Sequence, residues 1–290
     1  MQVDGFADPW EHIQLLSDTR RNQGLIQFLQ RHSPGRRVLE VGCGTGLFSC
    51  VAARLGATQV YAVEPTPLCE VARELVKVNG LDQVTVLEGR IQDLAPKPVD
   101  VAFSELLNSD PFYEEVAEAS LAAQKWVVDG GLCAPTRLKV WVAATGQRQT
   151  QSERPDAMHV VGQLEHAFDL DLACVKATLQ CDESFRFVSN EVTLVSEPAL
   201  AFDVKLGHEE TPDEERVLRL VCPESSVIRG AAVWFEAVYD DSLTLANAPG
   251  TPGHWGHLRF DWALARSVSG GTSFDVRVSV DDGEFDVSPV

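Results

Sequence analysis

The chain has 290 residues, of which 44% are hydrophobic, and it carries a formal net charge of −19. This length suits a catalytic domain followed by a second domain, and the acidity disfavours binding to nucleic acid while favouring cationic partners. None of its apolar runs approaches the roughly 20 residues that span a bilayer, and its seven cysteines include no C-x-x-C pair, so neither a membrane span nor a metal site is expected.

The first half of the chain alternates helices with short apolar strands. Residues 1–33 are predicted to be helical, with a stop at Ser33-Pro34-Gly35. Predicted strands follow at residues 36–42, 59–65, 84–89, 99–105 and from 130, and predicted helices at 47–56, 67–80 and about 114–128. This order predicts an α/β fold, a Rossmann-like domain over residues 1–135 whose parallel sheet has helices on both faces. Ligands of such sheets bind beyond the carboxyl ends of the strands.

The second half, residues 136–290, shows the alternation of apolar and polar residues that is typical of half-buried strands. The predicted strands lie at 137–144, 184–195, 199–206, 217–221, 228–239, 254–264 and 272–281. They predict a second domain built on a β-barrel or a similar sandwich. A predicted helical arm at about 147–179 interrupts it.

A glycine-rich turn follows the first predicted strand. Gly42, Gly44 and Gly46 form the pattern G-x-G-x-G, and Glu64, twenty residues after Gly44, ends the second strand. Glycine lets the backbone approach a ligand closely, and an acidic side chain at this strand end can accept hydrogen bonds from ribose hydroxyls. The combination predicts an adenosine ligand; a tight turn without a ligand is the plain alternative. The spacing disfavours NAD and resembles that of the seven-strand S-adenosylmethionine methyltransferases.

Three further segments resemble the protein arginine methyltransferases. The loop after the fourth strand begins with Ser104-Glu105 and, after eight more residues, reaches Glu114, which matches the double-glutamate loop of that family. Asp18-Thr19-Arg20-Arg21 resembles its D-x-x-R segment, and Gly253-His254-Trp255 resembles its T-H-W loop with glycine in place of threonine. The resemblance extends from about residue 8 to the C-terminus and is stronger in the first domain.

The resemblance implies an S-adenosylmethionine-dependent enzyme that methylates the guanidinium of an arginine in a protein or peptide. Glu105 and Glu114 would hold the acceptor, and Asp18 and His254 would form a pair at the mouth of the site. Arg21 would pair with the methionine carboxylate of the cofactor. Gln92 stands where the family has a glutamate that contacts the adenine amino group, and its amide oxygen can accept the same bond. The residues implied to bind the cofactor are Arg21, Gly42, Gly44, Gly46, Glu64, Gln92 and Glu105.

The chemistry explains why two carboxylates are needed. A guanidinium stays charged and its lone pairs are delocalised, so it is a poor nucleophile. Two carboxylates can grip its planar fork and draw positive charge toward the nitrogens that do not react. They also hold the remaining nitrogen in line with the methyl group, and such positioning can lower a barrier by about 7–11 kcal/mol.

Each residue also has a plain structural interpretation. Glu114 could be a first-turn acid that the helix dipole favours, Arg21 a surface residue of its helix, and His254 a structural histidine. The family's methionines near the acceptor are replaced by Leu15 and Val116, which leaves the number of added methyl groups open. A small-molecule or natural-product guanidine or amine methyltransferase and a non-catalytic regulatory paralogue therefore remain alternatives. The presence of all the motif residues disfavours the paralogue.

The expected partners follow from charge and resemblance. The substrate should be cationic, and the helical arm implies a homodimer in which the arm of one subunit docks on the cofactor-side helices of the other. An arm that packs on its own subunit is the competing interpretation. Neither nucleic acid nor membrane is expected as a partner. The acidic N-terminus lacks a signal-peptide pattern, so we expect a cytoplasmic protein, or a nuclear one in a eukaryote.

Overall fold

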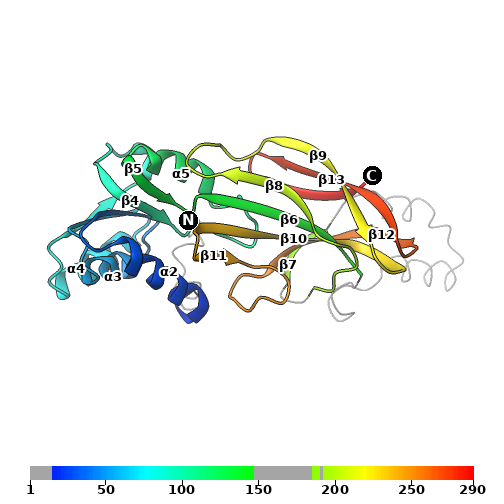
Figure 1. The fold of residues 1–290 in the computed structure, drawn as a ribbon, viewed down its shortest axis with the longest axis horizontal. Coiled ribbons are helices and arrows are strands. Elements are labelled where there is room, and N and C mark those ends of the chain that lie inside the picture. The colour runs from blue at the N-terminus through cyan, green and yellow to red at the C-terminus, as the bar shows by residue number, and fades with distance from the viewer. Residues whose placement is uncertain (1–14, 147–184, 190–191) are drawn as a thin grey trace, which may run out of the picture. The chain divides into compact units, whose positions relative to one another are not determined.

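The computed structural model describes residues 15–146, 185–189 and 192–290 (Figure 1). They form two compact units. The first contains the chain up to Lys139 with Phe202–Pro212 and Phe235–Trp255, and the second contains Val140–Ala201, Asp213–Trp234 and Gly256–Val290. The predicted arm at 147–179 and the predicted helix before Leu15 lie outside the described residues. Among the helices in the described ranges, none is long and apolar enough to cross a membrane.

A five-stranded parallel sheet forms the centre of the first unit. Its strands are β1 (Arg37–Val41), β2 (Gln59–Glu64), β3 (Val84–Glu88), β4 (Val99–Ser104) and β5 (Val127–Ala134), in the order β3-β2-β1-β4-β5. Covering both faces of a parallel sheet favours runs rich in valine, leucine and alanine. Val41 lies beside both Val63 and Ser104 in the register. Gly42, Glu64 and Glu105, at or just beyond the strand ends, therefore meet at one edge of the sheet.

Helices cover both faces of this sheet (Figure 1). They are α2 (Thr19–His32), α3 (Leu47–Arg54), α4 (Leu68–Val78), the 3-10 helix η2 (Ile91–Asp93) and α5 (Val116–Gln124). The Asp18 carboxylate accepts a hydrogen bond from the Arg21 N–H and so caps α2. On one face of the sheet, Phe28 of α2 packs near Phe103 of β4. On the other face, the buried ring of Trp126, just after α5, meets Tyr61 of β2 edge-on.

The helix predicted at about 114–128 extends too far at its C-terminal end. The observed helix α5 starts at Val116 and stops at Gln124, and β5 already begins at Val127. Val127 extends the apolar run of α5 in the sequence, but in the sheet it pairs with Val99 of β4. Pairing with a neighbouring strand, which the local pattern does not contain, therefore decides where the helix stops.

Antiparallel pairing dominates the remaining strands. The strands are β6 (Arg137–Thr145), β7 (Phe185–Ser189), β8 (Ala199–Lys205), β9 (Glu214–Cys222), β10 (Ser226–Asp240), β11 (Leu243–Ala246), β12 (His257–Val268), β13 (Thr272–Asp281) and β14 (Glu284–Pro289). One sheet has the order β7-β12-β10-β6-β8, with β11 beside β10, and a second has the order β14-β13-β9. The predicted alternation is clear in β13, where Val276, Val278 and Val280 are buried. The strands β11 and β14 were not predicted, because they are too short, at four and six residues, to show a clear alternation.

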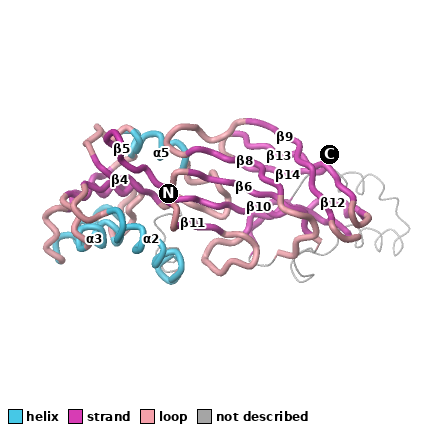
Figure 2. Tube along the Cα trace, in the orientation of Figure 1, coloured by secondary structure: helices cyan, strands magenta, loops and turns pink. Residues whose placement is uncertain are grey.

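This arrangement confirms the α/β fold with a Rossmann-like first domain and a β-rich, barrel-like second domain. Figure 2 shows that the described helices belong to the first unit, while the second unit is built from strands and loops.

A close approach between α3 and α4 generates the first testable prediction. Gly46, which precedes α3, has φ +78°, and a Cβ there would lie 2.8 Å from the Cβ of Ala72 on α4. We expect Gly46→Ala to lower the free energy of unfolding by about 2–5 kcal/mol, because left-handed strain and overpacking add. Gly80→Ala is the matched control, since Gly80 has φ +60° but open space around it, and it should cost only about 1–2 kcal/mol. Equal losses in chemical denaturation would show that the contact with Ala72 is not tight.

Candidate active site

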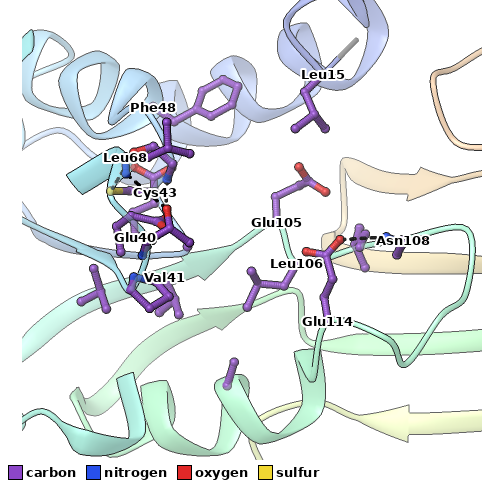
Figure 3. A pocket seen from close by; sticks show the side chains of 18 of the residues that line it. Leu15, Glu40, Val41, Cys43, Phe48, Leu68, Glu105, Leu106, Asn108 and Glu114 are labelled. Atoms are coloured by element: carbon purple, nitrogen blue, oxygen red, sulfur yellow. Dashed lines mark hydrogen bonds between the residues drawn. The ribbon is translucent and has the colours of Figure 1, made fainter. Parts of the chain in front are cut away.

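A cavity of about 440 Å³ lies where the strands of the parallel sheet end (Figure 3). The turn after β1, the end of β2, the segment after β3 and the loop between β4 and α5 all contribute to its wall, together with α2 and the chain around His254. Five of the lining residues carry carboxylates, so the wall is acidic. The lining side chains that can be charged are Arg21, Glu40, Glu64, Arg90, Glu105, Glu114, Glu115 and His254.

The glycine turn and Glu64 form one side of the cavity. Gly42 and Gly44 have φ of +71° and +51°, in the region that favours glycine. The buried Glu64 carboxylate accepts hydrogen bonds from the Gly44 N–H at 2.8 Å and from the Thr66 N–H at 3.0 Å. It thereby ties the turn to the end of β2, and carboxylate oxygens have further lone pairs for ligand hydroxyls. Gln92 is exposed in the same wall. The glycine turn, Glu64 and Gln92 together fit an adenosine ligand.

Glu40 is a buried acid beneath the turn that sequence reasoning did not single out. The Ser49 hydroxyl of α3 donates a hydrogen bond to its carboxylate. Burial raises the pKa of Glu40 from 4.5 to about 8, against the opposing effects of the Ser49 hydrogen bonds and the charge of Arg21. The available signal was an acidic residue inside an otherwise apolar strand, where a charge is costly unless it is paired.

Arg21 and Glu105 form an ion pair at the cavity wall. The Arg21 Nε donates to Glu105 Oε2 at 2.6 Å, and Nη2 contacts the same oxygen. Both side chains are only 8% exposed. Burial raises the pKa of Glu105, and the charge of Arg21 and its hydrogen bonds oppose that rise. The second oxygen, Glu105 Oε1, is buried and has no hydrogen-bond partner within the described parts of the chain. It can therefore accept a bond from a donor that a ligand brings.

Asp18 and His254 form a second pair beside it. Asp18 Oδ2 accepts a hydrogen bond from the His254 N–H at 3.0 Å and lies 2.8 Å from the ring Nδ1. Burial acts to raise the pKa of Asp18, but the hydrogen bonds from Arg21 and His254 outweigh it and hold that pKa below its usual value. A Cβ on Gly253 would lie 3.2 Å from Asp18 Oδ2, so the glycine leaves room for the pair.

Two aromatic side chains anchor the loop between β4 and α5. The Tyr239 hydroxyl donates to the Ser104 carbonyl at 2.8 Å, and the Trp255 Nε1 donates to the Leu107 carbonyl at 2.9 Å. Both donors are buried. Glu105 lies between the two anchored carbonyls, so its backbone is held on both sides.

Glu114 reaches the cavity from the other end of the same loop (Figure 3). Its Oε1 accepts a hydrogen bond from the Asn108 side-chain amide at 3.2 Å. The next residue, Glu115, precedes α5 with φ +53° and forms an ion pair with Arg90 at 3.1 Å. The loop therefore brings two glutamates nine positions apart into one cavity.

The structure gathers most of the predicted site residues around this cavity. Those that line it are Arg21, Gly42, Gly44, Glu64, Gln92, Glu105, Glu114 and His254. Asp18 reaches it through His254, while Gly46 packs against Ala72 behind the turn. Among the residues at the site that the sequence did not predict are Glu40, Phe48, Asn108 and Tyr239.

Comparisons with known proteins identify relatives of this chain. Residues 38–131 match a family model described as a methyltransferase domain. An arginine N(omega)-methyltransferase of Streptomyces achromogenes subsp. streptozoticus is 30% identical over 278 residues, which cover 88% of this chain and 73% of the relative. Protein arginine N-methyltransferase 6 of Xenopus tropicalis is 29% identical over 268 residues, which cover 86% of this chain and 77% of the relative.

Solved structures show the same fold. The Trypanosoma brucei PRMT1 enzyme-prozyme heterotetrameric complex with AdoHcy has a TM-score of 0.81 at 20% identity, over 98% of this chain and 93% of the other. Protein arginine methyltransferase 10 of Arabidopsis thaliana has a TM-score of 0.78 at 21% identity, over 94% of this chain and 88% of the other. At these identities the likeness establishes the fold.

The raised pKa of Glu40 generates the second prediction. Because this pKa is about 8 in the folded chain and near 4.5 in an unfolded one, the folded state binds the extra proton between these values. The free energy of unfolding of the ligand-free protein should therefore fall as pH rises through this window, by up to about 1.4 kcal/mol per pH unit. Glu40→Gln should flatten that slope in denaturation curves measured from pH 5 to 8.

Glu74→Gln is the matched control, since this α4 side chain is 63% exposed and should leave the slope unchanged. The raised pKa of Glu105 acts in the same direction, so some slope should remain in Glu40→Gln. A slope identical to that of the wild type would show that Glu40 is ionised in the folded protein.

Proposed function

The chain belongs to the protein arginine N-methyltransferase family, and we propose that it transfers the methyl group of S-adenosylmethionine to a guanidinium nitrogen of arginine in a protein or peptide. The observation that carries this proposal is the pair of carboxylates, Glu105 and Glu114, at one cavity beside a glycine turn. Among the described residues the buried Oε1 of Glu105 has no hydrogen-bond partner, so it can take a donor from a ligand. An acceptor guanidinium supplies that donor together with a positive charge.

The cofactor would lie against residues 1–135, which we propose as the cofactor-binding domain. It supplies an electrophilic methyl group on a positively charged sulfur. The backbone at Gly42 and Gly44 would lie against it, and Glu64 would accept bonds from the ribose. Gln92 would contact the adenine amino group. Arg21, already paired with Glu105, would use its remaining N–H groups on the cofactor carboxylate, so that one guanidinium links cofactor and acceptor sites.

Glu105 and Glu114 would hold the acceptor arginine between them. A guanidinium has five N–H donors in a planar fork, which suits two carboxylates that approach from different sides. Gripping the nitrogens that do not react directs the remaining one at the methyl group. We assign the proton that leaves after transfer to the Asp18–His254 pair, because His254 lines the cavity and Asp18 orients its ring through Nδ1.

A second candidate has an observation in its favour. The Streptomyces relative, whose match covers 88% of this chain, is named an arginine rather than a protein arginine methyltransferase. A free guanidine acceptor would use the same two carboxylates. Labelled-methyl transfer into an RG-rich peptide, histone tails and free arginine, with mass analysis of the products, separates the two candidates.

We also propose that the protein is a cytoplasmic homodimer. Val71 and Val78 on α4 are 49% and 66% exposed, and they form an apolar face on a cofactor-side helix. The predicted arm at 147–179, outside the described residues, is the proposed partner of this face in a second subunit. The net charge of −19 favours encounter with cationic substrates.

The third prediction tests the acceptor carboxylates. Glu105→Gln and Glu114→Gln keep the shape of the side chains and remove their charge. Each should lower methyl transfer to arginine by at least tenfold, because a charge-assisted hydrogen bond contributes roughly 1.5–3 kcal/mol. The double variant should lose less than the product of the two single losses, since both residues hold one group. The rates are measured with labelled S-adenosylmethionine.

Thermal shift by S-adenosylhomocysteine provides the control for this experiment. Glu114→Gln should keep the wild-type shift, whereas Glu64→Ala should lose most of it, because it deletes the ribose acceptor. If both glutamine variants methylate arginine at near wild-type rates, the loop does not clamp a guanidinium. If the wild type shows no shift with millimolar ligand, the methyltransferase proposal fails as a whole.

The fourth prediction concerns assembly. The wild type should sediment as a dimer at micromolar concentration, and the double variant Val71→Glu, Val78→Glu should sediment as a monomer with weakened cofactor binding. Val217→Glu, on a strand of the second unit and 56% exposed, is the control and should remain a dimer. A monomeric wild type would contradict the proposal.

A further inference from the structure

The side-chain amide of Asn108 bridges two parts of the loop between β4 and α5. Its Oδ1 accepts a hydrogen bond from the Asp110 N–H at 3.4 Å, and its Nδ2 donates to Glu114 Oε1 at 3.2 Å. Asn108 is half-buried in the cavity wall, as is Glu114. Figure 3 shows the two side chains joined across the loop.

These two partners determine how the amide is oriented. A backbone N–H can only donate, so the atom that faces Asp110 must be the amide oxygen. A carboxylate can only accept, so the atom that faces Glu114 must be the NH₂ group. The opposite orientation would break both bonds and place the amide oxygen against a carboxylate. The amide is therefore a fixed, neutral donor aimed at one oxygen of Glu114.

Glu114 is held differently from Glu105. The ion pair with Arg21 and two anchored carbonyls hold Glu105 in place. Glu114 accepts the bond from Asn108, and the exposed carboxylate of the next residue, Glu115, pairs with Arg90. A glutamate side chain has three rotatable bonds, and holding it in one rotamer has an entropic cost. The bond from Asn108 reduces that freedom before a substrate arrives.

We propose that Asn108 is a positioning residue that sets the orientation of the Glu114 carboxylate for the incoming guanidinium. The inference rests on the proposed function, because it assigns Glu114 to the acceptor. Asn108 does not touch the reacting atoms, and its effect passes through Glu114. Its main consequence is on acceptor binding, since a pre-oriented carboxylate loses less freedom when the fork docks. Cofactor binding, which depends on the turn after β1 and on Glu64, is unaffected.

Asn108→Asp separates this role from a structural role in the loop. An aspartate carboxylate still accepts the bond from the Asp110 N–H, so the turn is retained. It cannot donate to Glu114, and the two carboxylates repel each other at hydrogen-bond distance, which displaces Glu114. Asn108→Ala removes both bonds and is the companion variant. Asn79→Asp is the matched control, because it makes the same chemical change at an exposed amide, just after α4, whose Nδ2 donates to the Leu75 carbonyl within that helix.

The test measures acceptor KM and kcat with labelled S-adenosylmethionine and an RG-rich peptide or free arginine, whichever the wild type accepts. For Asn108→Asp we expect an acceptor KM raised by about tenfold or more, as loss of a hydrogen bond to a charged group implies. We expect kcat to fall by less than about threefold, because the bound guanidinium itself orients Glu114 once it has docked. Asn108→Ala should show the same split, and Asn79→Asp should match the wild type. The thermal shift with S-adenosylhomocysteine should be unchanged in all three.

Two results overturn the inference while the proposed function stands. One is an acceptor KM for Asn108→Asp that is unchanged or lower, which would mean that added negative charge matters and orientation does not. The other is a loss of cofactor binding in parallel with activity, which would make Asn108 a structural residue of the loop. A wild type that binds S-adenosylhomocysteine but neither methylates nor binds arginine, free or in a peptide, overturns the proposed function, and the inference falls with it.

Discussion

The buried ion pair between Arg21 and Glu105 is the interaction on which the rest of the site depends. Burying a charged carboxylate this far from water raises the free energy of the folded protein, and burial alone raises the pKa of Glu105. Arg21 compensates that cost only if its guanidinium stays within hydrogen-bond distance. Removing one partner of such a pair typically costs about 3–5 kcal/mol, because the other charge is left buried and alone. The fold must therefore fix the start of α2 and the end of β4 relative to each other.

Several contacts fix these two elements relative to each other. The Asp18 cap fixes the first turn of α2, and the packing of Phe28 against Phe103 and Tyr239 holds the helix to the sheet. The hydroxyl of Tyr239 then bonds to the Ser104 carbonyl, immediately before Glu105. The same side chain thus contacts both elements that carry the ion pair. This explains why Phe235–Trp255 groups with the first unit although it comes late in the sequence.

Much of this architecture could be predicted from the sequence, because it is encoded locally. The strand, glycine turn and helix at residues 38–54 have a periodicity and turn chemistry of their own, and Glu64 follows at a spacing that one crossover helix requires. The end of α5 could not be predicted, since pairing of Val127 with Val99 decides it. The role of Tyr239 was hidden for the same reason. A tyrosine in an alternating strand has no feature that points to a carbonyl 135 positions away.

Asn108 and Glu40 illustrate a different limit. An asparagine in a turn has an ordinary structural use, and an acid inside an apolar strand indicates a buried group without assigning it a role, so the sequence alone gives neither residue a function. Only the contacts do: Asn108 bonds to Glu114, and Glu40 is buried against Ser49 at the cavity. Residue types with many uses acquire a specific role from their neighbours.

The acidity of the cavity also limits which acceptors it can bind. Each buried carboxylate makes binding less favourable for a ligand that offers neither hydrogen-bond donors nor positive charge. A neutral amide or hydroxyl would leave Glu105 Oε1 without a charged donor in a partly dry site. An ammonium offers a compact point charge, whereas a guanidinium spreads its donors in a plane and can reach two carboxylates at once. In the function that we propose, the burial that the ion pair with Arg21 has to offset would therefore favour arginine over lysine as the acceptor.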